Sequence, residues 1–287
     1  MSKASLPSAK TALASLRKNG NQFEAVPLVP EPLGGVTYPH HGSDRTVAAD
    51  PRVLRATGRV YVADRTLRIA VHEAGGKTDS LLAGAAFLAR VFAQPRLIWG
   101  VSGYASIGIS CTHQADLLEA FYHHLTTNQR GTALVSDGAA GAGVLGISGV
   151  LAAEHNIPTF GVSPLEGMST MAPRDHMVIY GNTYQEREKI VGLVPDLLLI
   201  VGGGDGSRRE GVAALEAGSR VLLLDSNIPW RTVPKMRDAV HSGKLLVRSR
   251  IDEIPAAATQ LQDAALPTMA AARRARLGAI RHHFKSA

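Results

Sequence analysis

The chain has 287 residues, of which 45% are hydrophobic and 19% are charged, so it holds enough apolar side chain for a substantial core. This composition excludes a chain that is disordered throughout, and a lone cysteine, Cys111, excludes an internal disulfide. The formal net charge of +7 leaves a polyanionic partner open, although much of the excess lies in the last residues of the chain.

No window of the sequence approaches the roughly 18 uninterrupted apolar residues that a membrane span needs. We therefore expect a soluble protein without a membrane partner. The single cysteine favours a reducing compartment, which indicates a cytoplasmic location.

We expect no regular element in residues 1–57, because proline, glycine and polar residues interrupt the segment throughout. From Arg59 to His72 apolar residues alternate with polar ones, which predicts two short strands. An apolar helix is expected over residues 81–92. Residues 58–95 are thus interpreted as a small hairpin and helix appendage.

Residues 96–250 predict a Rossmann-like α/β domain, because short apolar runs alternate with helical segments. Strands are expected at residues 97–101, 132–136, 159–162, 177–180, 197–201, 221–224 and 245–247. Helices are expected at residues 113–127, 144–155, 184–194 and 207–217. The strands are continuously apolar, as in Leu197–Val201, which indicates a mainly parallel sheet with helices on both faces.

Residues 251–287 form a basic tail with helical character, whose cations include Arg273, Arg274 and Arg276. The pattern is typical of a solvated helix end. It also leaves a contact with nucleic acid open, although no aromatic residues interleave with the charges as base stacking would require.

A glycine-rich loop follows the second strand of the domain and opens the next helix. Gly141, Gly143 and Gly146 fit the pattern G-x-G-x-x-G, and Gly138 lies just before them. Without Cβ atoms such a loop approaches a phosphate closely, and the free N–H groups and the helix dipole favour the anion. Tight packing of strand on helix, without a ligand, explains the same glycines. The next strand does not end in an acid that would hold a ribose, so NAD-dependent hydride transfer is disfavoured.

A second loop, residues 202–210, also links a strongly apolar strand to a helix. Two such loops on neighbouring strands converge at the carboxyl edge of the sheet, where open α/β proteins bind ligands. The spacing of Ser207 and Glu210 also fits a capping box, which only satisfies helix-start N–H groups. Both roles are compatible, because capping would turn Glu210 toward the mouth of the loop. The glycines of this loop include Gly203, Gly204 and Gly206.

Two further segments adjoin these loops. A helix starts after Asn182, where Thr183 and Glu186 fit another capping box and Arg187 follows. A guanidinium at this place can clamp a phosphate or carboxylate with two hydrogen bonds, while a solvated ion pair is an equally common role. Residues 102–108, which include Gly103, form either a third wall of the pocket or an ordinary loop.

The sequence carries no metal or redox-cofactor motif. His72 and Glu73 begin an H-E-x-x-H pattern, but Gly76 stands where the second histidine is needed. The 11 histidines otherwise occur singly or in adjacent pairs, a spacing that suits solvent exposure. We therefore expect neither a metal site nor a cofactor.

The two glycine loops and the helix start at Arg187 together resemble the LOG-like, or lysine decarboxylase-like, family within the SLOG superfamily of Rossmann-type nucleotide binders. The resemblance runs from about Leu97 to Asp225. The family's P-G-G-x-G-T-x-x-E is similar to residues 202–210, and its G-G-G-x-x-G-L-M-G is similar to residues 138–146. Its M-H-x-R-K is similar to residues 184–188, where Gln185 and Glu188 replace histidine and lysine.

The resemblance implies a phosphoribohydrolase, which releases the base and ribose 5-phosphate from a nucleoside 5'-monophosphate. It implies catalytic roles for Glu210 and Arg187. It also implies a homodimer, because LOG-like proteins commonly form dimers. The expected ligand-binding and phosphate-binding residues are Gly103, Gly138, Gly141, Gly143, Gly146, Gly203, Gly204, Gly206 and Ser207.

Two other interpretations stay open. The charge reversal at Glu188 would change the substrate or abolish hydrolysis, which leaves a non-catalytic sensor or carrier of a nucleotide-derived ligand, such as ADP-ribose or molybdenum cofactor. The basic tail keeps a nucleic-acid-handling protein as the third interpretation.

Overall fold

The computed structural model describes residues 37–40, 43–46, 91–93, 96–105, 112–128, 133–164, 174, 176–179 and 183–286. Within these residues, seven strands form one sheet in the order β6-β5-β4-β3-β7-β8-β9, and all neighbouring pairs run parallel. This confirms the predicted α/β class and its parallel sheet. The strands are β3 (Ile98–Gly103), β4 (Leu134–Asp137), β5 (Thr159–Ser163), β6 (His176–Ile179), β7 (Leu197–Val201), β8 (Arg220–Leu224) and β9 (Leu245–Arg248).

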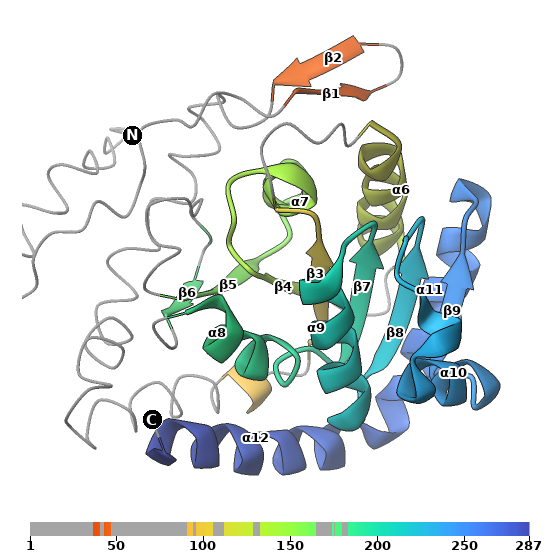
Figure 1. Ribbon diagram of the computed structural model, residues 1–287. Helices are drawn as coiled ribbons and strands as arrows, with labels where there is room; N and C mark the ends of the chain where they lie inside the picture. The colour runs from red at the N-terminus through yellow and green to blue at the C-terminus, as the bar shows by residue number, and fades with distance from the viewer. Residues whose placement is uncertain are drawn as a thin grey trace, which may run out of the picture.

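Helices cover both faces of this sheet (Figure 1). On one face, α6 (Thr112–Thr127), α7 (Gly143–Glu154) and α11 (Ile254–Ala265) share a single hydrophobic cluster with the strands. On the other face lie α8 (Tyr184–Val191), α9 (Asp205–Glu216) and α10 (Pro234–His241). The prediction of helices on both faces is therefore confirmed.

The strand β7 shows why its sequence is apolar without interruption. Leu197, Leu199 and Val201 belong to the cluster that contains residues of α6 and α11. Leu198 and Ile200 belong to the cluster that contains residues of α9 and α10. A strand covered on both faces needs an apolar residue at every position, and this is the pattern on which the prediction rested.

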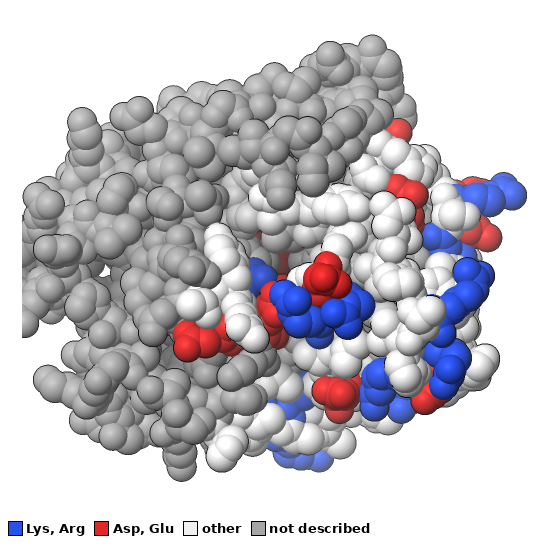
Figure 2. Space-filling model, viewed as in Figure 1, with Lys and Arg blue, Asp and Glu red and all other residues white. Residues whose placement is uncertain are grey.

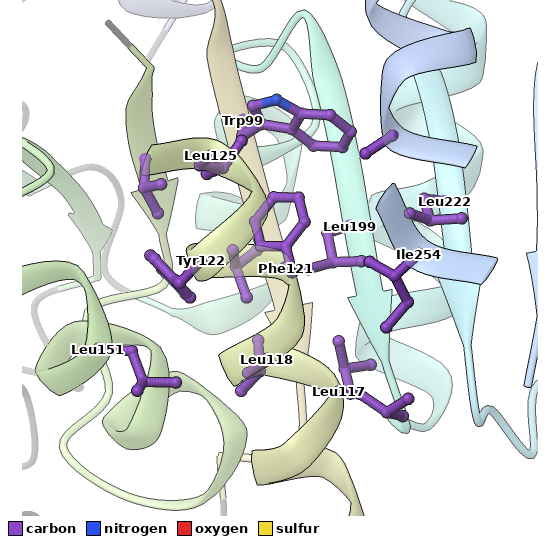
Figure 3. Close-up of a cluster of buried hydrophobic side chains, with 14 of the residues drawn as sticks. Trp99, Leu117, Leu118, Phe121, Tyr122, Leu125, Leu151, Leu199, Leu222 and Ile254 are labelled. Atoms are coloured by element: carbon purple, nitrogen blue, oxygen red, sulfur yellow. The ribbon is translucent and has the colours of Figure 1, made fainter. Parts of the chain in front are cut away.

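The largest hydrophobic cluster lies between the sheet and the helices α6, α7 and α11 (Figure 3). The Trp99 ring of β3 meets the Phe121 ring of α6 edge to face, with 4.9 Å between the ring centroids. The Tyr122 hydroxyl shares a hydrogen bond of 2.7 Å with Ser148 Oγ of α7, and burial raises the pKa of Tyr122 above its ordinary value. These contacts fix α6 and α7 on the sheet and thereby position the glycine loop that precedes α7.

All the strands and helices predicted for residues 96–250 are present, with ends shifted by up to three residues. The helix α10 was not predicted. None of the described helices combines the length and the apolar character that a membrane span requires.

The expectation that residues 1–57 hold no regular element is wrong at one place. β1 (Thr37–His40) and β2 (Ser43–Thr46) pair antiparallel, with Pro39 opposite Asp44. A sheet of two strands consists only of edge strands, where proline is tolerated. The hairpin predicted at residues 59–72 lies outside the described residues. Of the helix predicted at residues 81–92, the structure describes the end, and residues 91–93 are helical.

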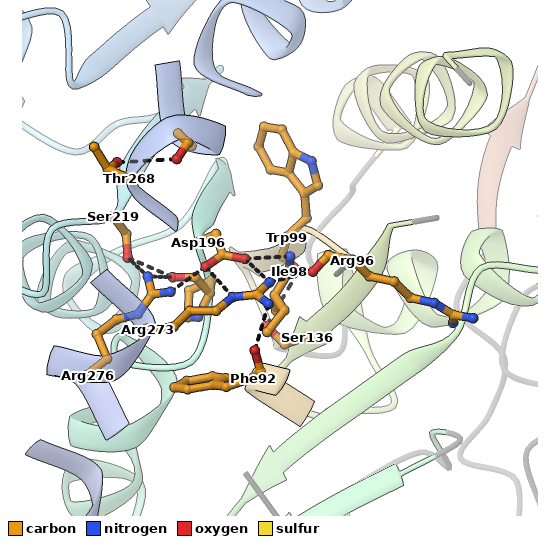
Figure 4. A network of polar contacts seen from close by, with 12 residues as sticks. Phe92, Arg96, Ile98, Trp99, Ser136, Asp196, Ser219, Thr268, Arg273 and Arg276 are labelled. Carbon is orange, nitrogen blue, oxygen red and sulfur yellow. Dashed lines mark hydrogen bonds and ion pairs between the residues drawn. The ribbon is translucent and has the colours of Figure 1, made fainter. Parts of the chain in front are cut away.

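The basic tail is a solvated helix end only in part, because Arg274 is exposed whereas Arg273 and Arg276 are buried. α12 (Met269–Ser286) runs along the amino edge of the sheet (Figure 1), and Arg273 and Arg276 are buried there. Arg273 Nε donates to Asp196 Oδ1 at 3.0 Å, and Arg276 Nη2 donates to the same oxygen (Figure 4). Asp196 Oδ2 also accepts from the Ile98 N–H at 2.9 Å. The charge pattern alone indicated exposure because the acid that binds Arg273 lies 77 residues earlier.

Candidate functional site

The strand order brings the loops after β3, β4 and β7 together at the carboxyl edge of the sheet. The chain adds β4, β5 and β6 on one side of β3, and then returns to add β7, β8 and β9 on the other side. Open α/β sheets bind their ligands at such a change of direction, outside the carboxyl ends of the strands. The described parts of the segments singled out from the sequence surround this point.

The first glycine loop, between β4 and α7, is tied down by a buried ion pair. Arg174 Nε donates to Asp137 Oδ2 at 3.0 Å, and Arg174 Nη2 donates to the Leu145 carbonyl at 3.0 Å. Asp137 Oδ1 accepts from the N–H of Ala139, whose φ is 56°, at 2.7 Å. Burial raises the pKa of the Asp137 carboxyl, and the Arg174 guanidinium opposes that rise. The protein itself therefore sets the shape of this loop.

Tyr104, after β3, contacts both glycine loops. The Val144 N–H donates to the Tyr104 carbonyl at 2.7 Å, and a Cβ at Gly143 would lie 2.4 Å from that carbonyl oxygen. A Cβ at Gly202 would lie 2.6 Å from the Tyr104 ring. Gly143 and Gly202 also have positive φ values of 61° and 63°. Backbone conformation and close packing are thus sufficient reasons for glycine at these two positions.

Glu210 of α9 meets Arg187 of α8 and Ser102 of β3 at this edge. Arg187 Nη2 donates to Glu210 Oε1 at 2.6 Å, and Ser102 Oγ donates to Glu210 Oε2 at 2.5 Å. Glu210 and Arg187 are only 5% and 7% exposed. The two residues that the resemblance assigns to catalysis therefore form one buried ion pair, although 23 residues separate them in the chain.

Arg187 fits because residue 138 is a glycine. A Cβ at Gly138 would lie 2.2 Å from Arg187 Nη1. The guanidinium also lies over the Tyr184 ring, 5.5 Å from its centroid, a cation–π distance. Arg187 Nε is buried and has no hydrogen-bond partner among the described residues. Gly138 thus makes room for the arginine, and the arginine keeps one donor that the described protein leaves unused.

The predicted capping box at Ser207 and Glu210 is wrong. α9 begins at Asp205, with Gly204 as its N-cap and no side-chain cap hydrogen bond. Ser207 is therefore inside the first turn and cannot cap the helix, and Glu210 binds Arg187 and Ser102 instead. The equivalent pattern at the start of α8 is a true capping box, in which the Glu186 N–H donates to Thr183 Oγ1 at 3.3 Å.

A second ion pair joins α8 to α9. Arg209 Nε and Nη2 donate to the two Glu188 carboxylate oxygens at 2.6 and 2.8 Å. This hydrogen bonding raises the pKa of Arg209, whose side chain is 49% exposed. Figure 2 shows side chains of both charges gathered over the amino end of α9. Arg209 therefore supplies, from α9, a positive charge beside the position where the LOG-like motif has lysine on α8.

The other predicted binding residues differ in the space around them. A Cβ at Gly103 would lie 2.5 Å from Val144 Cγ1, and one at Gly203 would lie 2.6 Å from Ser207 Oγ. A Cβ at Gly204 would meet nothing within 4 Å, and one at Gly206 would lie 3.5 Å from Glu188 Oε1. Gly204 and Gly206 therefore leave space beside the backbone at the amino end of α9. Gly141 and Gly146 are buried in the loop and in the first turn of α7.

Asp225, which the sequence analysis missed, follows β8 at the same edge. Its side chain is exposed, Gln114 Nε2 donates to its Oδ2 at 2.6 Å, and its φ is 40°. A positive φ outside glycine is uncommon and is frequent at functional sites. The strand that follows the first glycine loop does not end in an acid. In Rossmann-type sites the acid that binds a ribose follows the next strand after the glycine loop. For the loop that opens at Gly202, the next strand is β8, and Asp225 follows it.

The arrangement offers an arginine donor and an open helix start, which suit an anionic group of a ligand. The buried Glu210 carboxylate beside them suits a hydrogen-bond donor or a positive charge. Among the described residues, no three His, Cys, Asp or Glu side chains lie close enough together to hold a metal ion.

The described site lies within a segment that matches a known protein family. The LDcluster4 family model matches residues 100–254, more than half of the chain. The chain belongs to the SLOG cluster4 family. The SLOG part of the resemblance drawn from the glycine loops is thereby confirmed. The matched segment of this SLOG cluster4 protein includes Ser102, Arg187, Glu210 and Asp225.

Several solved structures are similar to this SLOG cluster4 protein. The molybdenum cofactor carrier protein MCP from Chlamydomonas reinhardtii has 23% identity over 58% of this chain and 99% of that chain, with a TM-score of 0.47. The molybdenum cofactor binding protein from Rippkaea orientalis has 20% identity over 59% of this chain and 96% of that chain, with a TM-score of 0.45. DNA processing protein A from Helicobacter pylori has 18% identity over 61% and 84%, with a TM-score of 0.37. A comparison with curated proteins finds no match.

Proposed function

We propose that this SLOG cluster4 protein binds a nucleoside 5'-monophosphate or a close relative and hydrolyses its N-glycosidic bond. The observation that carries the proposal is the buried Glu210 carboxylate beside Arg187 and Ser102, at the change of direction between β3 and β7. The LOG-like resemblance of the same segments supports this reaction. It also implies a homodimer, which we include in the proposal and which light scattering would test.

The proposed reaction needs a negative charge beside the sugar. Water adds its oxygen to C1' of the ribose, the bond to the base breaks, and the base leaves with the bonding electrons and takes up a proton. The transition state carries positive charge on the ribosyl ring, which a carboxylate in a water-poor site stabilises. Glu210 would face this charge, and Arg187, which donates to Glu210, would orient the substrate.

The amino end of α9 is the proposed phosphate site. The first N–H groups of a helix have no partner within the helix, and its dipole favours an anion there. Gly204 and Gly206 leave space beside this backbone, and Arg209 adds a partly exposed cation. The ribose would lie toward Asp225, because an acid after the next strand accepts hydrogen bonds from ribose hydroxyls in Rossmann-type sites.

One observation favours a second candidate, a non-catalytic sensor or carrier of a nucleotide-derived ligand. Both Glu210 oxygens already accept hydrogen bonds, and Arg187 neutralises the charge of the carboxylate. A carboxylate held in this way serves recognition as readily as catalysis. The nucleic-acid interpretation loses part of its support, because Arg273 and Arg276 of the tail are buried against Asp196.

A turnover assay tests the first candidate. The purified protein is incubated with a panel of nucleoside 5'-monophosphates, and free base is measured by chromatography. We expect release of base by the wild type and a loss of about 100-fold in kcat for Glu210→Gln, as is typical when a group that stabilises transition-state charge is removed. Glu216→Gln, at the exposed far end of the same helix, is the matched control and should retain activity.

The outcomes separate the two candidates. Equal turnover by the wild type and Glu210→Gln would remove Glu210 from the mechanism. No release of base from any monophosphate, together with saturable binding of ADP-ribose or a pterin cofactor, would assign the site to a sensor or carrier.

A further inference from the structure

A cavity of about 200 Å³ lies at the amino edge of the sheet, at the opposite ends of the strands from the candidate site. One wall is made of residues at or just before the starts of β7, β8 and β9, and the other is made of residues where α11 leads into α12. The lining residues that matter here are Asp196, Arg220, Lys244, Thr268, Met269 and Arg276.

The charges that line this cavity do not balance. Arg220, Lys244 and Arg276 contribute three cations, and Asp196 is the one acid among the lining residues. The Asp196 carboxylate is already bound by two buried guanidiniums, those of Arg273 and Arg276 (Figure 4). Two buried guanidiniums therefore share this one carboxylate in a region shielded from water.

Arg276 brings a buried positive charge to the wall of the cavity. It is 2% exposed, and its Nη1 donates to neutral acceptors, the Pro195 carbonyl at 2.6 Å and Ser219 Oγ at 2.9 Å. Its Nε is buried without a hydrogen-bond partner among the described residues. Burial lowers the pKa of this guanidinium, and Asp196 opposes that change.

The remaining walls are also suited to an anion. Arg220 is partly buried and donates from Nη1 to the Gly243 carbonyl at 3.3 Å, whereas Lys244 is exposed. Thr268 and Met269 stand where α12 begins, and Ala265 of the same wall stands where α11 ends, so opposite ends of two helix dipoles meet there and the side-chain cations set the charge. Buried and exposed cations thus surround one small space.

We infer that this cavity binds a small oxyanion of the phosphate type, either free phosphate or the phosphate group of a phosphomonoester. Pockets for whole small-molecule ligands measure roughly 300–1,000 Å³. A cavity of about 200 Å³ suits a compact anion better than a complete nucleotide. Because it lies at the other edge of the sheet, the inference holds independently of the proposed function.

Titration calorimetry on the full chain tests the inference, with inorganic phosphate and glycerol phosphate as probes and chloride at equal ionic strength as the blank. We expect saturable binding to the wild type, weakened by about tenfold or more in the double variant Arg220→Gln and Lys244→Gln, because two charged hydrogen-bond donors are lost. The matched control is Lys235→Gln with Arg237→Gln, which removes the same charge from the exposed face of α10 and should bind as the wild type does.

Tighter binding of phosphate would support a free ion as the ligand, and tighter binding of glycerol phosphate would support a phosphomonoester. The unfolding temperature of each variant in chloride shows that it is folded. The inference is overturned if neither probe binds the wild type, or if the two double variants lose binding equally. It is also overturned if only Arg209→Gln, at the candidate functional site, abolishes binding.

Discussion

At the scale of single residues, a substitution of Gly138 tests how closely the first glycine loop packs against Arg187. In Gly138→Ala the new methyl group would meet Arg187 Nη1 at 2.2 Å, so the guanidinium must move away from Glu210 or the loop must shift. We expect a loss of about 1–3 kcal/mol in the free energy of unfolding, the usual cost of overpacking a buried position. Urea unfolding measures this loss.

Gly204→Ala is the matched control for this prediction, because a Cβ at Gly204 meets nothing within 4 Å. Its free energy of unfolding should stay close to that of the wild type. Equal stability of Gly138→Ala and Gly204→Ala would mean that the loop yields easily and that Arg187 is not held in place by it.

Single residues also show what the departures from the LOG-like motif mean. Glu188 reverses the charge of the motif lysine, but its carboxylate is bound through both oxygens by Arg209. Arg209 thus neutralises the charge of Glu188. The partly exposed cation at this place is Arg209 itself, which belongs to α9. The charge presented to a ligand depends on both helices, which no motif on one helix reveals.

At the scale of elements, His124 links the packing of α6 to pH. Burial lowers the pKa of His124, and a hydrogen bond with Gln262 of α11 opposes this change. The unfolded chain, with a histidine pKa of about 6.5, then binds more protons than the folded chain at mildly acidic pH. Stability therefore rises with pH in that range. We expect the free energy of unfolding to fall between about pH 7 and pH 5, and part of this fall to disappear in His124→Gln.

The control for the pH experiment is His241→Gln, on the exposed end of α10. Denaturant unfolding at several pH values compares the three proteins. If the free energy of unfolding of His124→Gln falls as steeply with decreasing pH as that of the wild type, the pH dependence does not arise from the contact between α6 and α11.

The elements themselves could largely be predicted from the sequence, because their signals are local. β7 was predicted with its observed ends, since a strand buried on both faces is apolar at each position. The pattern Thr183-x-x-Glu186 was interpreted correctly for the same reason, as its partners lie within one turn.

The parts of the site that could not be predicted depend on distant partners. The pattern Ser207-x-x-Glu210 is as good a capping box by sequence, but Glu210 instead binds Ser102, which lies 108 residues away. The buried arginines of the tail were missed in the same way, because Arg276 binds Asp196 across 80 residues. A one-dimensional pattern contains no information about a partner that only the fold brings near.

At the scale of the whole molecule, Asp196 connects the sheet to α12. Asp196→Asn would remove the negative charge that both buried guanidiniums bind, while changing the shape of the side chain very little. We expect a loss of about 3–5 kcal/mol in the free energy of unfolding, as when one partner of a buried ion pair is removed. Guanidinium chloride unfolding followed by circular dichroism measures it.

Asp252→Asn is the control, because the ion pair of Asp252 with Arg250 is exposed and contributes little to stability. It should unfold as the wild type does. A similar curve for Asp196→Asn would show that the neutral hydrogen bonds of Arg273 and Arg276 suffice to hold α12.

The position of β3 between β4 and β7 has a consequence for synthesis on the ribosome. Trp99 of β3 pairs beside Leu197 of β7, so the middle of the sheet closes only after nearly a hundred further residues have been added. During that interval one edge of an apolar strand stays open, and such edges recruit other chains. We therefore expect a nascent chain to need chaperones while the residues between β5 and β7 are being added. Products truncated in this interval should aggregate.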